Sequence, residues 1–195
     1  FGVLLKTGGW GKYVLDLAFD RVSKMRGGPA KAAILGSGMT GLISGSSIAN
    51  TVTTGTFTIP IMKKTGFSKE KAGAIEVSSS VNGQLMPPVM GAAAFVMASF
   101  LGVTYFEVVK HAFLPAIISY VALFYISHLE ALKLNLKGMD DVDIPNLKKT
   151  FLSGLHFLIP IFVLVYMLVY LRFTASYSIF FATIALIIVN LGYIL

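Results

Sequence analysis

Apolar segments alternate along this chain with short segments that hold most of its charged residues. An apolar segment of about 20 residues is long enough to cross a bilayer as a helix. The pattern therefore predicts an all-α integral membrane protein. The apolar segments comprise residues 32–62, 72–101, 112–127, 157–171 and 176–195.

The first apolar segment, residues 32–62, is predicted to form a re-entrant helical hairpin. Basic residues flank it at both ends, with Lys31 before it and Lys63 after it, and basic loops tend to stay in the cytoplasm. The segment must then enter the membrane, turn and return. Each arm would have roughly a dozen residues and rise about 18 Å, less than the apolar core of about 30 Å. The polar stretch from Ser44 to Thr54 is expected to supply the turn.

The second apolar segment, residues 72–101, is predicted to form a broken transmembrane helix. Pro87 and Pro88 remove two backbone donors, so two half-helices should be joined by an unwound segment from Val81 to Pro88. Glu76 is the one charged residue here. An intramembrane acid could carry a proton, but the nearby lysines favour a place at the cytoplasmic interface.

The remaining segments complete the predicted organisation. Residues 1–31 combine an amphipathic helix, or the end of a spanning helix, with a basic loop. Residues 63–131 hold the broken helix, an outer loop with Glu107, Lys110 and His111, and a crossing at 112–127. Residues 132–152 form a cytoplasmic loop with a surface helix from Asp143 to Phe151, and residues 153–195 add two crossings. The chain begins without Met and ends inside an apolar run, so we expect a piece of a longer protein.

The composition of the chain restricts the classes of function that it can have. The chain is 55% hydrophobic and 13% charged, with a net charge of +7, whereas a soluble domain has about 25% charged residues. The basic residues form short clusters between apolar segments, which favours membrane topology over nucleic-acid binding. There is no Cys, and His111, His128 and His156 are scattered, so no thiolate or imidazole metal site is expected. No carboxylate pair or Ser-His-Asp set occurs at membrane depth, so we do not expect an enzyme.

Polar residues at the two breaks are candidates for an ion and substrate site. Helix-breaking polar sequence is tolerated at membrane depth where it lines a cavity or is buried in protein. Neutral oxygens suit a weakly held cation such as Na⁺, although such residues also occur where helices pack closely. The candidate side chains are Ser46, Ser47, Asn50, Thr51, Thr53, Thr54 and Asn82.

Several motifs resemble the large membrane subunit of tripartite ATP-independent periplasmic (TRAP) transporters. The motifs are GGPAK at residues 27–31 and SGSSIANTVTTGTFTIP at residues 44–60. GQLMPPVMGAAAF at residues 83–95, with HLEA at residues 128–131, is similar to the fused permeases that pair with TAXI-type binding proteins.

This resemblance implies an elevator-type transporter with inverted repeats in a bacterial or archaeal inner membrane. It implies a Na⁺ gradient as driving force and a TAXI-type periplasmic protein that delivers an organic acid. This chain would hold one repeat and need the remainder of the permease. Residues 49–51 would be the hairpin tip and residues 81–83 its unwound partner, with Ala49 standing where related carriers have Ser. The implied Na⁺ ligands are Ser46, Asn50, Thr51, Asn82 and Gly83; the implied substrate-binding residues are Ser47, Asn50, Thr53, Thr54, Asn82, Gly83 and Pro87.

Two other functions stay open from the sequence. The chain could belong to a Na⁺/dicarboxylate carrier of the same superfamily that works without a binding protein. It could also be a non-transporting membrane scaffold whose Gly, Ser and Thr residues form helix-packing seams.

Overall fold

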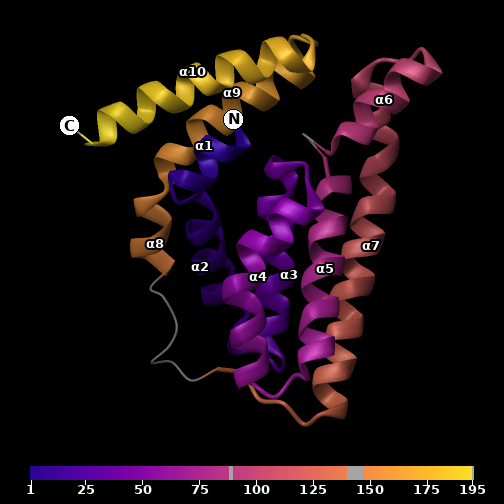
Figure 1. Cartoon of the computed structure of the whole chain (residues 1–195), viewed down its shortest axis with the longest axis vertical. Coiled ribbons are helices and arrows are strands. Elements are labelled where there is room, and N and C mark those ends of the chain that lie inside the picture. Colours follow the sequence, from indigo (N-terminus) through magenta and orange to yellow (C-terminus); the bar gives the residue numbers. More distant parts are fainter. Residues whose placement is uncertain (88–89, 140–146, 195) are drawn as a thin grey trace.

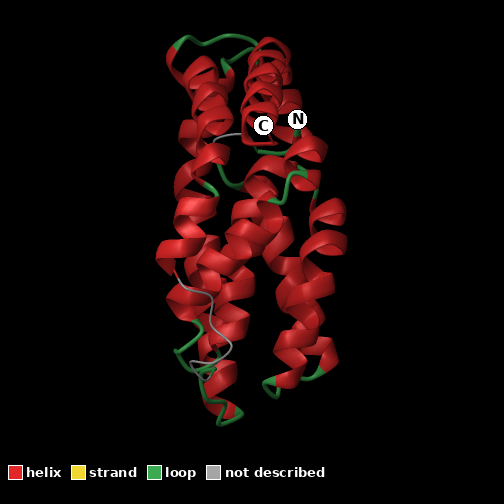
Figure 2. Ribbon diagram, turned by 90° about the vertical axis from the view of Figure 1, so that its left-hand side faces the viewer, coloured by secondary structure: helices red, strands yellow, loops and turns green. Residues whose placement is uncertain are grey.

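The structure is a computed structural model that describes residues 1–87, 90–139 and 147–194 of the 195. Within these ranges every regular element is a helix and there is no strand (Figure 2). A 3₁₀ turn at Leu155–Phe157 precedes α9, and a π-helical turn at Tyr166–Tyr170 follows it. The helices are α1 (Gly2–Thr7), α2 (Trp10–Val22), α3 (Gly28–Ser44), α4 (Ser47–Lys64), α5 (Lys69–Leu85), α6 (Ala92–Leu101), α7 (Tyr105–Lys133), α8 (Leu147–Ser153), α9 (Leu158–Val165) and α10 (Ala175–Ile194).

Helices α3 and α4 form a helical hairpin with a two-residue turn. Gly45 ends α3 in the left-handed conformation (φ 61°), which a residue without Cβ adopts at little cost. Ser46 then caps α4, because its Oγ accepts a hydrogen bond from the Ala49 amide at 3.3 Å. The turn thus lies within the predicted stretch from Ser44 to Thr54 but takes up only Gly45 and Ser46, and residues 49–51, the expected hairpin tip, are helical. The cap lets the polar residues after Ser46 continue as helix, so the arms reach 17 and 18 residues.

Helix α5 continues further than the sequence predicted. Asn82 and Gly83 are helical, and α5 ends only at Leu85. The predicted unwound segment therefore starts too early, because the proline-imposed break falls at Met86, which is extended before Pro87 (φ −80°, ψ 129°). The chain resumes as α6 at Ala92, with the Gly91 amide donating to the Gln84 carbonyl at 2.7 Å. Pro88 and Val89 lie outside the described residues.

Helix α3 lies at the centre of the bundle, between α2, α4, α5 and α7 (Figure 1). Small residues on α3 allow these close approaches. Gly36 faces Leu15 of α2, Gly38 faces Tyr120 of α7, and Gly41 faces Gly83 of α5. An apolar cluster fills the end of the bundle away from the hairpin turn; it comprises Ala30, Ala33, Ile34, Met62, Phe67, Ala72, Ile75 and Ala131.

Helix α7 has 29 residues and is the one described helix that is long and apolar enough to cross a membrane. The predicted outer loop with Glu107, Lys110 and His111 is part of it. Thr104 caps α7, since its Oγ1 accepts from the Glu107 amide at 3.3 Å, so the helix begins at Tyr105 and Glu107 lies in its first turn. The prediction of a loop there was wrong.

The terminal helices pack against each other rather than along the bundle. Helices α9 and α10 lie across one end of it, above α1 (Figure 1). Phe157 and Leu186 pack against Leu5, Trp10 and Val14 of α1 and α2. The two crossings predicted for residues 153–195 are thus present as apolar helices, but they do not run beside α7. Of the predicted surface helix, Leu147–Ser153 is helical, and residues 140–146 are not described.

Candidate functional site

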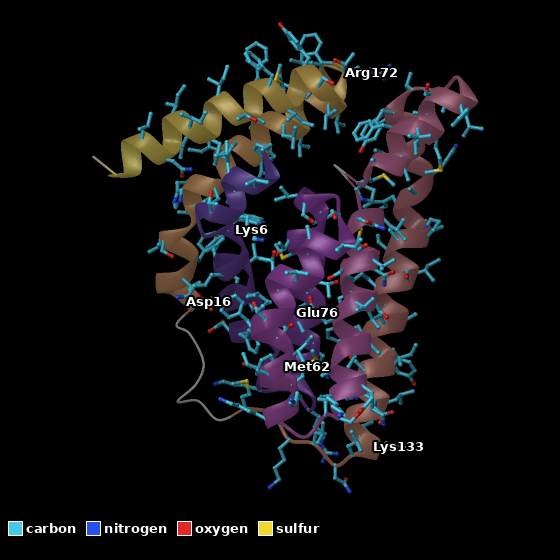
Figure 3. All side chains as sticks on the ribbon, in the orientation of Figure 1. Lys6, Asp16, Met62, Glu76, Lys133 and Arg172 are labelled. Carbon is cyan, nitrogen blue, oxygen red and sulfur yellow. The ribbon has the colours of Figure 1, made fainter. Side chains whose placement is uncertain are left out.

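A buried polar cluster lies where both hairpin arms meet α5. At its centre is Glu76 of α5, which has no exposed surface and lies near the middle of the long axis, between α4 and α5 (Figure 3). Four hydroxyl groups surround its carboxyl group. Ser37 Oγ lies 2.9 Å from Oε1, Thr58 Oγ1 lies 2.6 Å from Oε2, Ser80 Oγ lies 3.4 Å from Oε1, and Thr54 Oγ1 also contacts Oε1. The cluster therefore joins α3, α4 and α5.

Asn50 extends the same cluster toward the hairpin turn. Its side chain is 1% exposed, and Nδ2 donates to the Ser37 carbonyl at 2.8 Å, to Ser37 Oγ at 2.9 Å and to Ser80 Oγ at 3.1 Å. Its Oδ1 is buried without a hydrogen-bond partner among the described residues. A buried amide oxygen without a donor is costly, so this oxygen is available to a ligand.

A cavity of about 280 Å³ reaches this cluster from the side of α1 and α2. Asn50 and Thr53 line it from the first turns of α4, and Thr40 and Ser44 line it from α3. Lys6 of α1, an exposed residue, is also part of the lining, and Figure 3 shows it on the side of α1 that faces the hairpin. The cavity thus combines hydroxyl groups, an amide and one positive charge.

The structure brings some of the predicted site residues together and separates others. Asn50 and Thr54 belong to the buried cluster, and Thr53 lines the cavity while its hydroxyl group donates to the Ala49 carbonyl at 2.6 Å. Gly83 lies against Gly41, and Gly41 in turn lies beside Asn50 Nδ2. These roles in binding stay predictions.

The other predicted residues have different surroundings. Asn82 is directed to α7, where its Oδ1 accepts a hydrogen bond from Ser119 Oγ at 2.9 Å. Ser46 caps α4, and the Ser47 amide donates to Gln84 Oε1 at 3.0 Å, which ties the hairpin turn to α5. Thr51 and Pro87 are half-buried, in α4 and in the break after α5. The predicted meeting of Asn50 with Asn82 is therefore replaced by a contact of Asn50 with Ser80.

Sequence reasoning missed the centre of this cluster. It favoured an interfacial Glu76 because of Lys69 and Lys71, but these residues lie about 10 and 8 Å further along the helix axis. Lys69 is exposed, and Lys71 forms an ion pair with Glu130 of α7. Neither lysine is therefore buried beside Glu76. The available signal was a spacing of four residues, which places Thr54 above Thr58 and Glu76 below Ser80 on single helix faces.

The chemistry of the cluster fits a hard cation. Ser37 and Ser80 contact Asn50 Nδ2 through their hydroxyl groups, and Ser37 also contacts the Glu76 carboxyl group, so the cluster that holds the unpartnered Asn50 Oδ1 is rich in oxygen atoms. Such donors suit Na⁺ rather than a transition metal. In the described part of the chain, no three His, Cys, Asp or Glu residues are grouped as metal ligands.

Comparison with known protein families shows the family to which this chain belongs. Residues 1–193 match the family described as the tripartite ATP-independent periplasmic transporter, DctM component. The chain belongs to this TRAP transporter family, whose members are integral membrane permeases. The resemblance to the large membrane subunit of TRAP transporters is thereby confirmed, whereas the similarity to the fused, TAXI-type permeases stays a prediction.

Proteins similar to this chain include three from bacteria. The chain is 27% identical to the uncharacterized protein YgiK of Salmonella typhimurium over 84% of its length, and 27% identical to a putative TRAP transporter large permease protein of Haemophilus influenzae over 69%. It is 37% identical to the C4-dicarboxylate TRAP transporter large permease protein DctM of Vibrio cholerae over 43%. The matched regions cover 38%, 31% and 18% of those proteins, so the chain spans less than two fifths of their length.

Proposed function

We propose that this chain is part of the permease of a Na⁺-coupled secondary transporter that carries organic acids delivered by a periplasmic binding protein. Membership of the TRAP family supports a transporter component. The observation that carries the proposal is the buried polar cluster around Asn50 and Glu76. Polar side chains inside an apolar membrane bundle are costly, and those that occur there typically serve a function.

The hairpin suits a re-entrant position in the membrane. Helix α7 is about 43 Å long, whereas α3 and α4, the two arms of the hairpin, are each about 26 Å long. In Figure 1 the hairpin begins at the end of the bundle where α7 ends, and its turn stops short of the level where α7 begins. Apolar side chains on α7, such as Phe113, Leu114 and Val121, are mostly exposed, as expected of a surface that faces lipid. We propose that the hairpin tip reaches the interior of the bilayer.

For sodium, we propose Asn50 Oδ1 with the hydroxyl groups of Ser37, Thr54 and Ser80 as the protein oxygens that hold the ion. When bound, the ion would supply the positive charge that this polar cluster lacks. Of the sodium ligands expected from the sequence, this set keeps Asn50 and leaves out Ser46, Thr51, Gly83 and Asn82. The Asn82 side chain is directed to α7.

For the substrate, we propose a small organic anion in the cavity beside Asn50. Its volume is about 280 Å³, near the lower end of the range for small-molecule pockets. The first turns of α4 line it, and the amino end of a helix attracts negative charge. Lys6 adds a positive charge. Relatives are named for C4-dicarboxylate and isethionate, both small anions. A TAXI-type binding protein stays a prediction from the sequence motifs.

Uptake by the full-length permease in proteoliposomes tests this proposal. The probes are a radiolabelled C4-dicarboxylate and isethionate, each with and without the binding protein encoded beside the permease, under an inward Na⁺ gradient. We expect uptake that requires both Na⁺ and the binding protein. Asn50→Ala should reduce uptake at least tenfold and raise the Na⁺ concentration required. Thr56→Ala is the matched control, because this hydroxyl group is exposed on the same helix and bonds the Thr53 carbonyl.

The same experiment separates the alternatives. Uptake that needs Na⁺ but not the binding protein would favour the independent dicarboxylate carrier. Uptake that responds neither to Na⁺ removal nor to Asn50→Ala would contradict the proposal.

A further inference from the structure

We propose that a groove between α3 and α7 binds an anionic phospholipid, with the phosphate group at Lys31 and an acyl chain against an apolar wall. The groove has a volume of about 450 Å³, within the range of small-molecule pockets. The apolar wall comprises Ile34, Leu35, Tyr120, Val121, Phe124 and Tyr125. The groove shares no lining residue with the cavity beside Asn50, so this second site is independent of the proposed function.

A buried lysine forms the polar end of the groove. Lys31 is 1% exposed, and its Nζ lies 3.0 Å from His128 Nδ1 and 5.4 Å from the centroid of the Phe124 ring. An ammonium group has no acceptor, so His128 Nδ1 accepts this hydrogen bond and the ring keeps its Nε2–H as a second donor. No carboxylate of the described residues pairs with Lys31, and Glu130 of the same helix as His128 pairs with Lys71.

These contacts leave the positive charge of Lys31 without a counter-charge. The face of an aromatic ring offsets part of the cost of burying an ammonium group, but a buried charge is normally paired with an opposite one. A phosphodiester group supplies one negative charge, and its oxygens can accept hydrogen bonds from both the lysine and the histidine. The polar end of the groove is therefore complementary to a phosphate group.

The order of the residues along both helices matches the orientation of a lipid. Lys31 lies in the first turn of α3 and His128 near the end of α7, toward the end of the bundle that carries Lys133 (Figure 3). Tyr120 precedes His128 by eight residues, which places it about 12 Å further along α7, toward the middle of the bundle. A headgroup at the membrane surface and an acyl chain directed inward require this order.

The outer surface of the groove fits a lipid of negative charge. Leu35, Val121 and Tyr125 are 36%, 62% and 60% exposed, as expected of side chains that contact acyl chains. Lys24 and Arg26 are exposed on either side of Met25, which also lines the groove. Basic residues near a membrane surface attract anionic lipids, and basic pockets between helices bind their headgroups. A zwitterionic lipid would bring a second positive group toward Lys31, so the ligand is an anionic lipid.

Native mass spectrometry of the purified full-length permease tests this proposal without a substrate. The delipidated protein in detergent is titrated with dioleoyl phosphatidylglycerol or dioleoyl phosphatidylcholine, and the Kd of the first bound lipid is measured. We expect the wild type to bind phosphatidylglycerol at least tenfold more tightly. Lys31→Met keeps the length of the side chain without its charge and should remove this preference. Lys64→Met should retain it, because Lys64 is exposed at the same end of the bundle and is not part of the lining.

A second pair of variants tests the apolar wall without altering a charge. Val121→Trp fills the groove with a large side chain and should weaken the binding of phosphatidylglycerol at least tenfold. Ile126→Trp is the matched control, because Ile126 is 61% exposed on the same helix and lies outside the lining; it should retain the binding. Size-exclusion profiles verify that all four variants are folded.

The outcomes are decisive even if one variant fails to fold. A preference of the wild type smaller than tenfold, or one that Lys31→Met retains, would overturn the anionic site. If Lys31→Met does not fold, Val121→Trp decides: unchanged binding of phosphatidylglycerol would mean that another part of the permease covers the groove, and the proposal would fail. These measurements use neither Na⁺ nor uptake, so the lipid site and the proposed transport function stand or fail separately.

Discussion

Gly83 of α5 and Gly41 of α3 lie so close that neither position has room for a side chain. A Cβ atom on Gly83 would be 2.8 Å from Gly41 Cα and 3.1 Å from the Gly38 carbonyl oxygen. These neighbours are backbone atoms and cannot move as a flexible side chain would. The contact sets the distance between the hairpin and α5, so it also sets the reach from Asn50 to Ser80.

Gly83→Ala should therefore destabilise the protein. We expect the free energy of unfolding to fall by about 1–3 kcal/mol, as for an overpacked core, measured by thermal unfolding of the full-length protein in detergent. Gly73→Ala on the same helix is the control, since no atom lies within 4 Å of its Cβ position; it should be neutral or stabilise by up to about 1 kcal/mol. Equal effects of the two changes would refute the close helix contact.

At the residue scale, the sequence predicted the hydroxyl and amide residues better than their partners. Asn50 and Thr54 were identified because polar groups in an apolar segment are conspicuous. Their contacts with Ser37 and Ser80 depend on the rotation of three helices about their axes, which the local pattern does not fix. Glu76 was judged by its distance in sequence from lysines, whereas the helix carries those lysines toward the exposed end.

The turn between α3 and α4 is the element that decides where the hairpin ends. Gly45 and Ser46 are its only residues outside the helices. We expect Ser46→Ala to lower the free energy of unfolding by about 1 kcal/mol, because it removes the hydroxyl group that caps α4. Ser78→Ala, at an exposed position of α5, should change it by less than about 0.5 kcal/mol. Thermal unfolding of both variants measures the difference. A Ser46→Ala variant with an unchanged free energy of unfolding would contradict the role of Ser46 as a cap.

At the element scale, the basic flanks of residues 32–62 were enough to predict a hairpin, because charge restricts which ends can share one side of a membrane. The helix limits were harder to predict. Polar residues weaken a helix on average, yet one cap at Ser46 made Ser47–Lys64 continuous. Likewise Asn82 and Gly83 are helical, because the backbone hydrogen bonds of α5 continue until Pro87, which has no N–H group to donate.

At the scale of the whole molecule, charge and apolar surface indicate its orientation in the membrane. Lys133 and Arg172 lie at opposite ends of the long axis, and Glu76 lies between them (Figure 3). The end with Lys133 also carries the exposed Lys63, Lys64 and Lys69. By the positive-inside rule we predict that this end faces the cytoplasm. The hairpin would then enter from the cytoplasmic side, with its turn directed toward the periplasm.

Single cysteines test this orientation, because the chain itself has none. They are introduced into a full-length permease that lacks other cysteines and are treated with a membrane-impermeant maleimide. Lys133→Cys should react only after the membrane is permeabilised, and Arg172→Cys should react in intact cells. Val121→Cys is the control for lipid contact: the side chain is 62% exposed on α7, yet a thiol inside the bilayer is not ionised and should stay unreactive in both conditions. Labelling of Lys133→Cys in intact cells would reverse the orientation, and the hairpin would then enter from the periplasmic side.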